Sequence, residues 1–187
     1  MKNLSNLLNR ISNWKTLLAA FIIYMFFNGY LLKNAEEKIN DLSGKTIGVI
    51  DLTFGFDAQK TLDMVAAYSD EARDYYAQTE LITDVIYPIV YSLFFGIILT
   101  LLFKGKSYSP HRLVNILPFF SLLFDYLENS TIVYLLNNYP TQSQSVAILC
   151  EIFKLLKWLS FGLVIALILY GLVKLLLVKL SPSKPNN

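Results

Sequence analysis

Four long stretches of the chain contain almost no charged residues, at about residues 14–32, 81–103, 113–136 and 146–178. A helix needs about 20 mostly apolar residues to cross the hydrocarbon core of a bilayer. A soluble protein of 187 residues has no interior large enough to bury four such stretches. Only 16% of the residues are charged, against about 25% in an average soluble domain. The sequence therefore predicts an all-α membrane protein, a single domain over residues 1–187 built as a bundle of four transmembrane helices.

Lysine and arginine gather in segments that would lie on one side of such a bundle. They occur before the first stretch, at residues 104–112 and after the fourth stretch, whereas residues 137–145 contain none. Short basic loops stay in the cytoplasm. We therefore expect a protein integral to the cell (inner or plasma) membrane, with both termini cytoplasmic. The sequence NAEEK follows the first stretch where a signal peptide would have a cleavage site, so we expect a retained helix there.

Three totals exclude whole classes of function. The net charge of +2 is too small to suggest a nucleic-acid partner. The single Cys150 forms no disulfide within the chain, and its apolar surroundings favour a buried, inert thiol. One histidine does not make a multi-histidine metal site. No metal and no cofactor are predicted.

The region at about residues 34–77, between the first two stretches, is net acidic and predicts a small cap outside the cytoplasm. Hydrophobic and polar residues alternate in TIGVIDLTFGF, which indicates a short extended segment with one packed face. Asp57 is a suitable N-cap for a short helix over residues 58–67. Ser69 should begin a further helix that runs without a break into the second stretch. An extended segment can also pair with another chain, so a membrane protein partner or a homo-oligomer formed through the cap stays open.

Charged and polar residues on the four expected helices are the most informative feature, because such residues rarely face lipid. Helical spacings of three and four place them on one face of each helix, in the outer half of the bundle. These residues are Asn28 on the first helix; Arg73, Glu80, Asp84, Tyr87 and Tyr91 on the second; Asp125, Glu128 and Asn129 on the third; and Lys154 and Lys157 on the fourth. The pattern predicts an outward-facing, charged cavity with these residues as ligand-binding candidates. A closed ion-pair network that fixes the helix register is the structural alternative.

Such a cavity favours a protein that binds a membrane lipid or an amphiphilic small molecule, or an accessory membrane subunit. The first alternative is an enzyme acting on a lipid or isoprenoid, with Asp125 and Glu128 as general acid and base. Lys154 or Lys157 would then stabilise negative charge or hold a phosphate head group. The second alternative is a small component of ion- or proton-coupled transport.

Four segments of the sequence carry a resemblance. DAQKTLDMVAAYSDEARDYY, DVIYPIVY, DYLEN and LKW together resemble a family of small bacterial integral membrane proteins with four helices, over about residues 51–158. The resemblance implies that Asp84, Asp125, Glu128, Asn129 and Lys157 are signature positions. No established activity comes with that family, so the resemblance supports the site residues and leaves the reaction open.

Overall fold

A computed structural model describes residues 1–103 and 109–180, and 86% of it is helical. The described residues contain no β-strand, which confirms the all-α class. Part of the basic segment at 104–112 and the C-terminal tail fall outside the described residues. The helices are α1 (Lys2–Ile11), α2 (Trp14–Phe26), the π-helical η1 (Phe27–Leu32), α3 (Lys33–Ser43), the 3-10 turn η2 (Ile50–Leu52), α4 (Ala58–Ala67), α5 (Asp70–Phe103), the 3-10 segment η3 (Ser109–Ile116), α6 (Pro118–Asn137) and α7 (Gln144–Leu180).

Three helical rods are long and apolar enough to cross a membrane, at Trp14–Ser43, Asp70–Phe103 and Gln144–Val178. Their outward faces expose large apolar side chains, such as Ile22 on α2 and Leu169 and Leu176 on α7. Exposed apolar surface on this scale is suited to lipid rather than to water. The chain is therefore a membrane protein by length, composition and exposure. The fourth expected crossing, α6, spans 20 residues and carries two acids and an asparagine within it.

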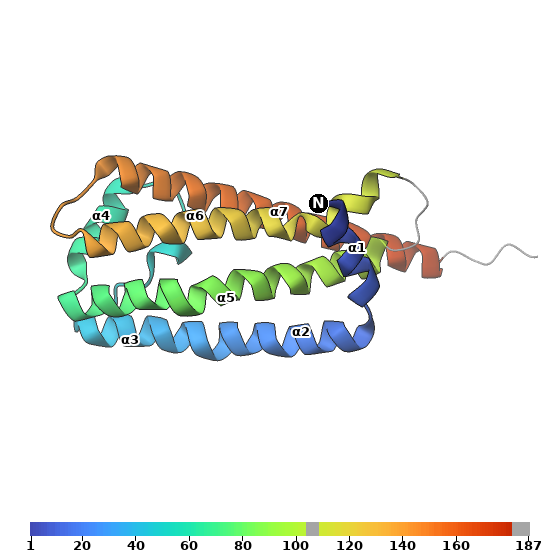
Figure 1. The fold of residues 1–187 in the computed structure, drawn as a ribbon, viewed down its shortest axis with the longest axis horizontal. Coiled ribbons are helices and arrows are strands. Elements are labelled where there is room, and N and C mark those ends of the chain that lie inside the picture. Colours follow the sequence, from blue (N-terminus) through green and yellow to red (C-terminus); the bar gives the residue numbers. More distant parts are fainter. Residues whose placement is uncertain (104–108, 181–187) are drawn as a thin grey trace, which may run out of the picture.

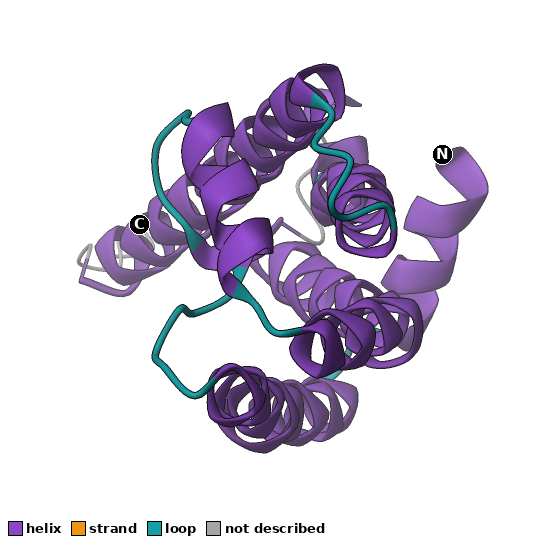
Figure 2. Ribbon diagram, turned by 90° about the vertical axis from the view of Figure 1, so that its left-hand side faces the viewer, coloured by secondary structure: helices purple, strands orange, loops and turns teal. Residues whose placement is uncertain are grey.

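The long helices run side by side, with alternating direction along the chain (Figure 1). α6 packs against both α5 and α7, whereas the rod formed by α2, η1 and α3 packs on α5. In the described part of the chain, neither α2 nor α3 forms an extensive interface with α6 or α7. α4 and most of the loops lie at one end, seen face-on in Figure 2, and α1 and η3 lie at the other end. The region between the α2–α3 rod and α7 is therefore not closed by helix packing.

The first crossing is longer than the sequence predicted. Asn13 caps it, accepting hydrogen bonds from the backbone N–H groups of Lys15 and Thr16, and the helix continues through η1 to Ser43. Residues from about 34 onward were expected to begin the cap, but Lys33–Ser43 is helical and extends the rod by three turns. The helix ends where Gly44 adopts a left-handed φ of +66°, a conformation that glycine accepts without strain.

The short helix predicted over residues 58–67 is confirmed at Ala58–Ala67, with the Asp57 carboxylate accepting the Lys60 N–H. The unbroken α5, from Asp70 to Phe103, is confirmed as well.

The extended segment with one packed face is wrong. Ile50–Leu52 forms a 3-10 turn, closed by the N–H and hydroxyl of Thr53 on the Ile50 carbonyl, and this turn breaks the alternation. Ile50 is fully buried, but Leu52, Phe54 and Phe56 are 52%, 80% and 54% exposed.

The helix expected as the third crossing begins later than predicted. The predicted start at residue 113 falls in η3, and α6 starts at Pro118. Proline has no N–H to donate and a φ already suited to a helix, so it is favoured in the first turn and ends the preceding segment. The fourth helix, Gln144–Leu180, extends the predicted 146–178 by two residues at each end.

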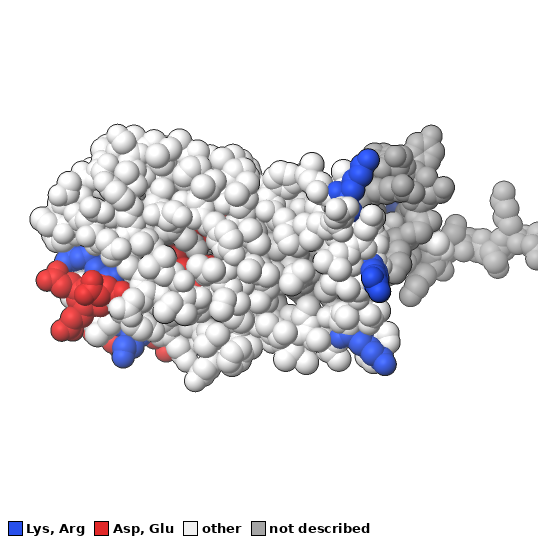
Figure 3. Space-filling model, in the orientation of Figure 1, with Lys and Arg blue, Asp and Glu red and all other residues white. Residues whose placement is uncertain are grey.

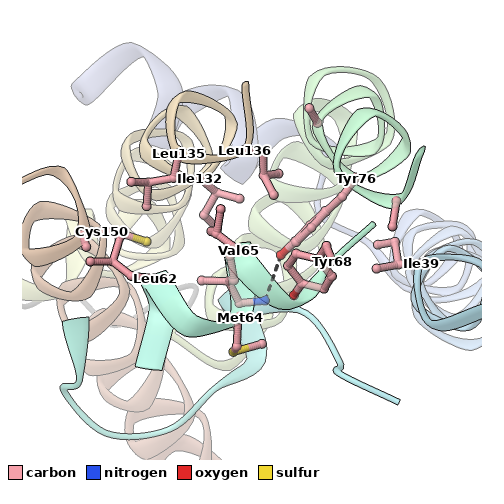
Figure 4. Packing of buried hydrophobic residues seen from close by; sticks show 14 of the residues in the cluster. Ile39, Leu62, Met64, Val65, Tyr68, Tyr76, Ile132, Leu135, Leu136 and Cys150 are labelled. Atoms are coloured by element: carbon pink, nitrogen blue, oxygen red, sulfur yellow. Dashed lines mark hydrogen bonds between the residues drawn. The ribbon is translucent and has the colours of Figure 1, made fainter. Parts of the chain in front are cut away.

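Two apolar cores hold the rods together. At the cap end, α4 packs on α5, α6 and α7 through Leu62, Val65, Tyr76, Ile132 and the free, buried thiol of Cys150 (Figure 4). The Tyr76 hydroxyl accepts the Ile50 N–H at 2.9 Å, the hydrogen bond drawn in Figure 4.

At the other end, the core is made mostly of aromatic rings on α5. Phe94, Phe95 and Phe103 pack with Leu99 and with Val164 of α7. Aromatic rings supply most of the buried side chains of this core, and partly buried aliphatic side chains surround them.

Candidate functional site

A cavity of about 550 Å³ lies between the α2–α3 rod, α5, α7 and the segment around η2. Its volume falls within the range of small-molecule binding sites. The cavity residues with polar or aromatic side chains are Tyr24, Asn28, Lys33, Glu36, Asp51, Tyr76, Thr79, Glu80, Asp84, Tyr87, Tyr91, Asp125, Lys157, Trp158 and Phe161. The cavity therefore occupies the region that helix packing leaves open.

The wall formed by α5 carries two acids one turn apart, Glu80 and Asp84, both buried. The side-chain amide of Asn129 donates to an Asp84 carboxylate oxygen at 3.0 Å. The Oε2 atom of Glu80 is buried and has no hydrogen-bond partner among the described residues. Within those residues, no lysine or arginine nitrogen lies within 4.0 Å of either carboxylate. These two acids are thus buried without a cationic partner among the residues that the structure describes.

Lys157 of α7 lies at the boundary between this cavity and α6. Its ammonium is 2.5 Å from a Glu128 oxygen and 3.4 Å from an Asp125 oxygen. The Tyr91 hydroxyl donates to the other Asp125 oxygen at 2.9 Å. Asp125 and Lys157 line the cavity, but Glu128 is fully buried behind them. One ammonium is therefore shared by two carboxylates.

Lys154, one turn away on α7, belongs to a different cluster. It pairs with Glu151 at 2.5 Å and donates to the Thr53 hydroxyl at 2.6 Å. Glu151 also accepts the Thr61 hydroxyl at 2.7 Å and the Asp57 N–H at 3.1 Å. We call Lys154, Glu151, Thr53, Thr61 and Asp57 the anchor cluster, because it ties the cap to α7. Its lysine does not line the cavity.

Arg73 also serves the cap. It donates to the carbonyl oxygens of Val65 and Tyr68 at the end of α4, pairs with Asp70, and stacks 3.9 Å from the ring centre of Tyr139. Burial raises the pKa of the Tyr68 hydroxyl, which donates to the Gly48 carbonyl at 2.8 Å. Arg73 thus satisfies helix-end carbonyls and does not line the cavity.

The structure brings seven of the eleven predicted site residues together around the cavity: Asn28, Glu80, Asp84, Tyr87, Tyr91, Asp125 and Lys157. It places Arg73, Glu128, Asn129 and Lys154 outside the lining. Glu128 and Asn129 lie directly behind the lining, as the partners of Lys157 and Asp84.

Sequence reasoning missed Asp51, Glu36 and Trp158. Asp51 had a visible signal, because it lies on the polar side of the alternating segment, and in the structure it accepts the Tyr76 hydroxyl at 3.0 Å. Glu36 was assigned to a cap that proved to be helix. Trp158 was placed in an apolar stretch and in the LKW segment of the resemblance, but it was not predicted to line a site.

The cavity is acidic. Five carboxylates line it, against the two ammonium groups of Lys33 and Lys157. Lys33 pairs loosely with Glu37, both groups being largely exposed, and Lys157 is already shared by two acids. The described residues contain no group of three or more acids, histidines or cysteines placed to hold a metal ion.

The chain matches no protein family, and neither a curated protein nor a solved structure is similar to it. The functional proposal therefore rests on the geometry of the cavity and on its place in the fold.

Proposed function

We propose that this protein crosses the membrane four times and binds a lipid or another amphiphile in the cavity, through an opening on its side. The observation that carries the proposal is a cavity of about 550 Å³ with buried, unpaired acids in a wall of a membrane protein. A ligand whose head group enters the cavity and whose chain stays in the bilayer fits this arrangement.

The four crossings are α2–η1–α3, α5, α6 and α7. α6 qualifies as the fourth because Asp125, Glu128 and Asn129 all face partners inside the protein, which removes the cost of exposing them to lipid. Acidic side chains gather at the α3–α4 end of the molecule, whereas the charged atoms visible at the opposite end are basic (Figure 3). Positive charge marks the cytoplasmic side, so both termini are cytoplasmic and the cap lies outside.

Sideways access follows from how the rods pack. The α2–α3 rod lies on α5. Among the described residues, the segment around η2 lies between this rod and α7, beside the cavity. Lys154 lies ten residues into α7, which is about 15 Å along the helix, and Thr53 contacts it there. The exposed Leu52, Phe54 and Phe56 therefore lie at a depth where lipid chains are their natural surroundings.

Binding is better supported than acid–base catalysis by Asp125 and Glu128. Lys157 pairs with both carboxylates, and Glu128 is fully buried and does not line the cavity. A general acid or base must reach the proton that it transfers. A passage through the bundle is less well supported, because the aromatic core around Phe94, Phe95 and Phe103 fills the other half.

The test is to fill the cavity and look for loss of a bound amphiphile. Thr79 lines the cavity and its hydroxyl donates only to the Tyr75 carbonyl of its own helix, so Thr79→Phe fills space without breaking a contact between helices. Ser130→Phe is the matched control, because Ser130 is exposed on α6 and makes the same kind of bond to Tyr126.

The readout is native mass spectrometry of protein extracted gently from its own membrane. Wild type and Ser130→Phe are expected to carry a reproducible bound lipid or amphiphile, and folded Thr79→Phe is expected to have lost it. An empty wild type, or a ligand that both variants retain, would contradict a binding role for the cavity.

A further inference from the structure

Among the described residues, Glu80 and Asp84 on α5 lack the cationic partner and the full set of hydrogen-bond donors that a closed ion-pair network provides. Glu80 is only 3% exposed, its Oε2 atom has no hydrogen-bond partner among the described residues, and Asp84 receives one amide donor. A buried carboxylate without a cation or enough donors is costly, and proteins retain few of them without a use. Both side chains line the cavity, so a cationic group bound there can supply the missing positive charge.

The two lysines that the sequence offered as phosphate ligands, Lys154 and Lys157, are already paired with carboxylates. Lys157 is already 2.5 Å from Glu128 and 3.4 Å from Asp125, and Lys154 is closed inside the anchor cluster. A phosphate head group entering the cavity would meet Glu80, Asp84 and Asp51. Among the described residues, the further ammonium in the lining is that of Lys33, which is largely exposed and lies 3.8 Å from Glu37. Like charges brought together in a partly buried site repel strongly, so the cavity disfavours an anion.

The aromatic walls favour a cation for a second, independent reason. Tyr87, Tyr91, Trp158 and Phe161 line the cavity, with ring centres 5.3 Å apart for the two tyrosines and 6.2 Å apart for Tyr91 and Phe161 and for Trp158 and Phe161. Aromatic faces attract ammonium groups, and such rings form the recognition sites of quaternary ammonium ligands. The protein's own Lys157 ammonium already lies 5.8 Å from the centre of the Trp158 ring.

We infer that the cavity selects amphiphiles whose head group carries a cationic ammonium, held by Glu80 and Asp84 and surrounded by the tyrosine and tryptophan rings. This inference rests on the proposed binding function and names the chemistry that it recognises. The ammonium can belong to a free cationic amphiphile or to the choline or ethanolamine end of a zwitterionic membrane lipid. Both sources present the same group to the two acids.

Trp158 provides a direct reporter of occupancy. The chain has two tryptophans, and Trp14 is 68% exposed at the start of α2, outside the cavity. In Trp14→Phe protein, the fluorescence reports on Trp158 alone. We would titrate this protein in dodecyl maltoside micelles with dodecyltrimethylammonium, dodecylphosphocholine and dodecyl phosphate.

The ammonium probe is expected to change the fluorescence saturably, at a concentration at least about ten-fold lower than the phosphate needs, which is about 1.4 kcal/mol. Dodecylphosphocholine binding as tightly as the trimethylammonium probe would assign the ammonium to a membrane lipid, and much weaker binding would assign it to a free amphiphile. Phosphate binding as tightly as trimethylammonium would overturn the inference.

Two variants identify the acids responsible. Glu80→Gln and Asp84→Asn, each in the Trp14→Phe background, are expected to weaken trimethylammonium binding about ten-fold or more, because each removes a charge that would pair with the ligand in a buried site. Glu71→Gln is the control, since Glu71 is exposed on the same helix outside the cavity, and it should bind like its parent. Unchanged binding in both cavity variants would overturn the inference.

Failure of the underlying binding function gives a different result. In that case none of the three probes would produce a saturable signal that Thr79→Phe abolishes, whatever its charge. A cavity that binds all three probes, without preference for the cation, would keep the binding function and overturn the head-group selectivity.

Discussion

Lys154 and Lys157 lie one turn apart on the same helix, yet their surroundings differ in kind. Lys154 has one carboxylate partner, Glu151, and that carboxylate is satisfied by Thr61 and the Asp57 N–H. Lys157 is shared by two carboxylates, and more acids lie beyond it along the cavity wall. The anchor cluster is balanced and closed, whereas the acids of the cavity outnumber its cations. The buried charges of the anchor cluster therefore stabilise the packing of the cap on α7, whereas those of the cavity leave an excess of negative charge that a cationic ligand can neutralise.

The largest expected loss of stability comes from removing the Lys154 ammonium of the anchor cluster. Lys154→Met leaves the Glu151 carboxylate, 1% exposed, without its cation, and should lower the free energy of unfolding by about 3–5 kcal/mol. Titration with sodium dodecyl sulfate, followed by circular dichroism, measures this loss. The double variant Lys154→Met, Glu151→Met should regain most of it. A single variant as stable as wild type would mean that the cluster does not hold the cap.

A matched pair of isosteric changes separates the anchor cluster from the cavity wall. Thr61→Val removes a 2.7 Å hydrogen bond to the Glu151 carboxylate and should cost about 1.5–3 kcal/mol, measured in the same titration. Thr79→Val removes a bond to a carbonyl of its own helix and should cost no more than about 0.5 kcal/mol. Equal losses of unfolding free energy at Thr61 and Thr79 would show that the anchor cluster contributes no more to stability than the cavity wall does.

The densely packed end of the molecule gives a third contrast. A Cβ on Gly96 would lie 3.0 Å from the Asn115 carbonyl oxygen and 3.3 Å from a Leu8 methyl group, so Gly96→Ala should destabilise by about 1–3 kcal/mol.

Gly162 of α7 has open space around it, so Gly162→Ala is the control and should be neutral or stabilising by up to about 1 kcal/mol. Thermal unfolding in detergent compares the two. A harmless Gly96→Ala would mean that α1 and η3 do not pack tightly on α5.

Sequence reasoning predicted the elements that depend on local signals. The helix at Ala58–Ala67 follows from the Asp57 cap, and the unbroken α5 follows from Ser69 and the acids after it. The extended segment was predicted wrongly because Tyr76, far along the chain, holds the Ile50 N–H and favours a turn instead. The overlong first rod was missed because charged residues in α3 resemble those of a loop.

The site residues, too, were predicted only as far as local sequence patterns determine them. Helical spacing correctly placed Glu80, Asp84 and Tyr91 on one face, and the cavity lies against that face. Spacing alone did not distinguish Lys154 from Lys157, because both lie on neighbouring turns of α7. Thr53 and Thr61, which close the first cluster, come from segments about 100 and 90 residues away. Partners that distant are determined by the tertiary fold and leave no local pattern.

The most direct test compares one substitution in the two regions, Glu151→Gln and Glu80→Gln. Cys150 is the chain's only cysteine and is fully buried, so a thiol-reactive fluorescent dye reports thermal unfolding in dodecyl maltoside. Glu151→Gln is expected to lower the midpoint by many degrees, yet dodecyltrimethylammonium should still raise it. Glu80→Gln is expected to leave the midpoint unchanged or higher, and to abolish the rise. The distinction between a closed anchor and an open site would be contradicted if both variants had equally lowered unfolding midpoints and if dodecyltrimethylammonium shifted both midpoints equally.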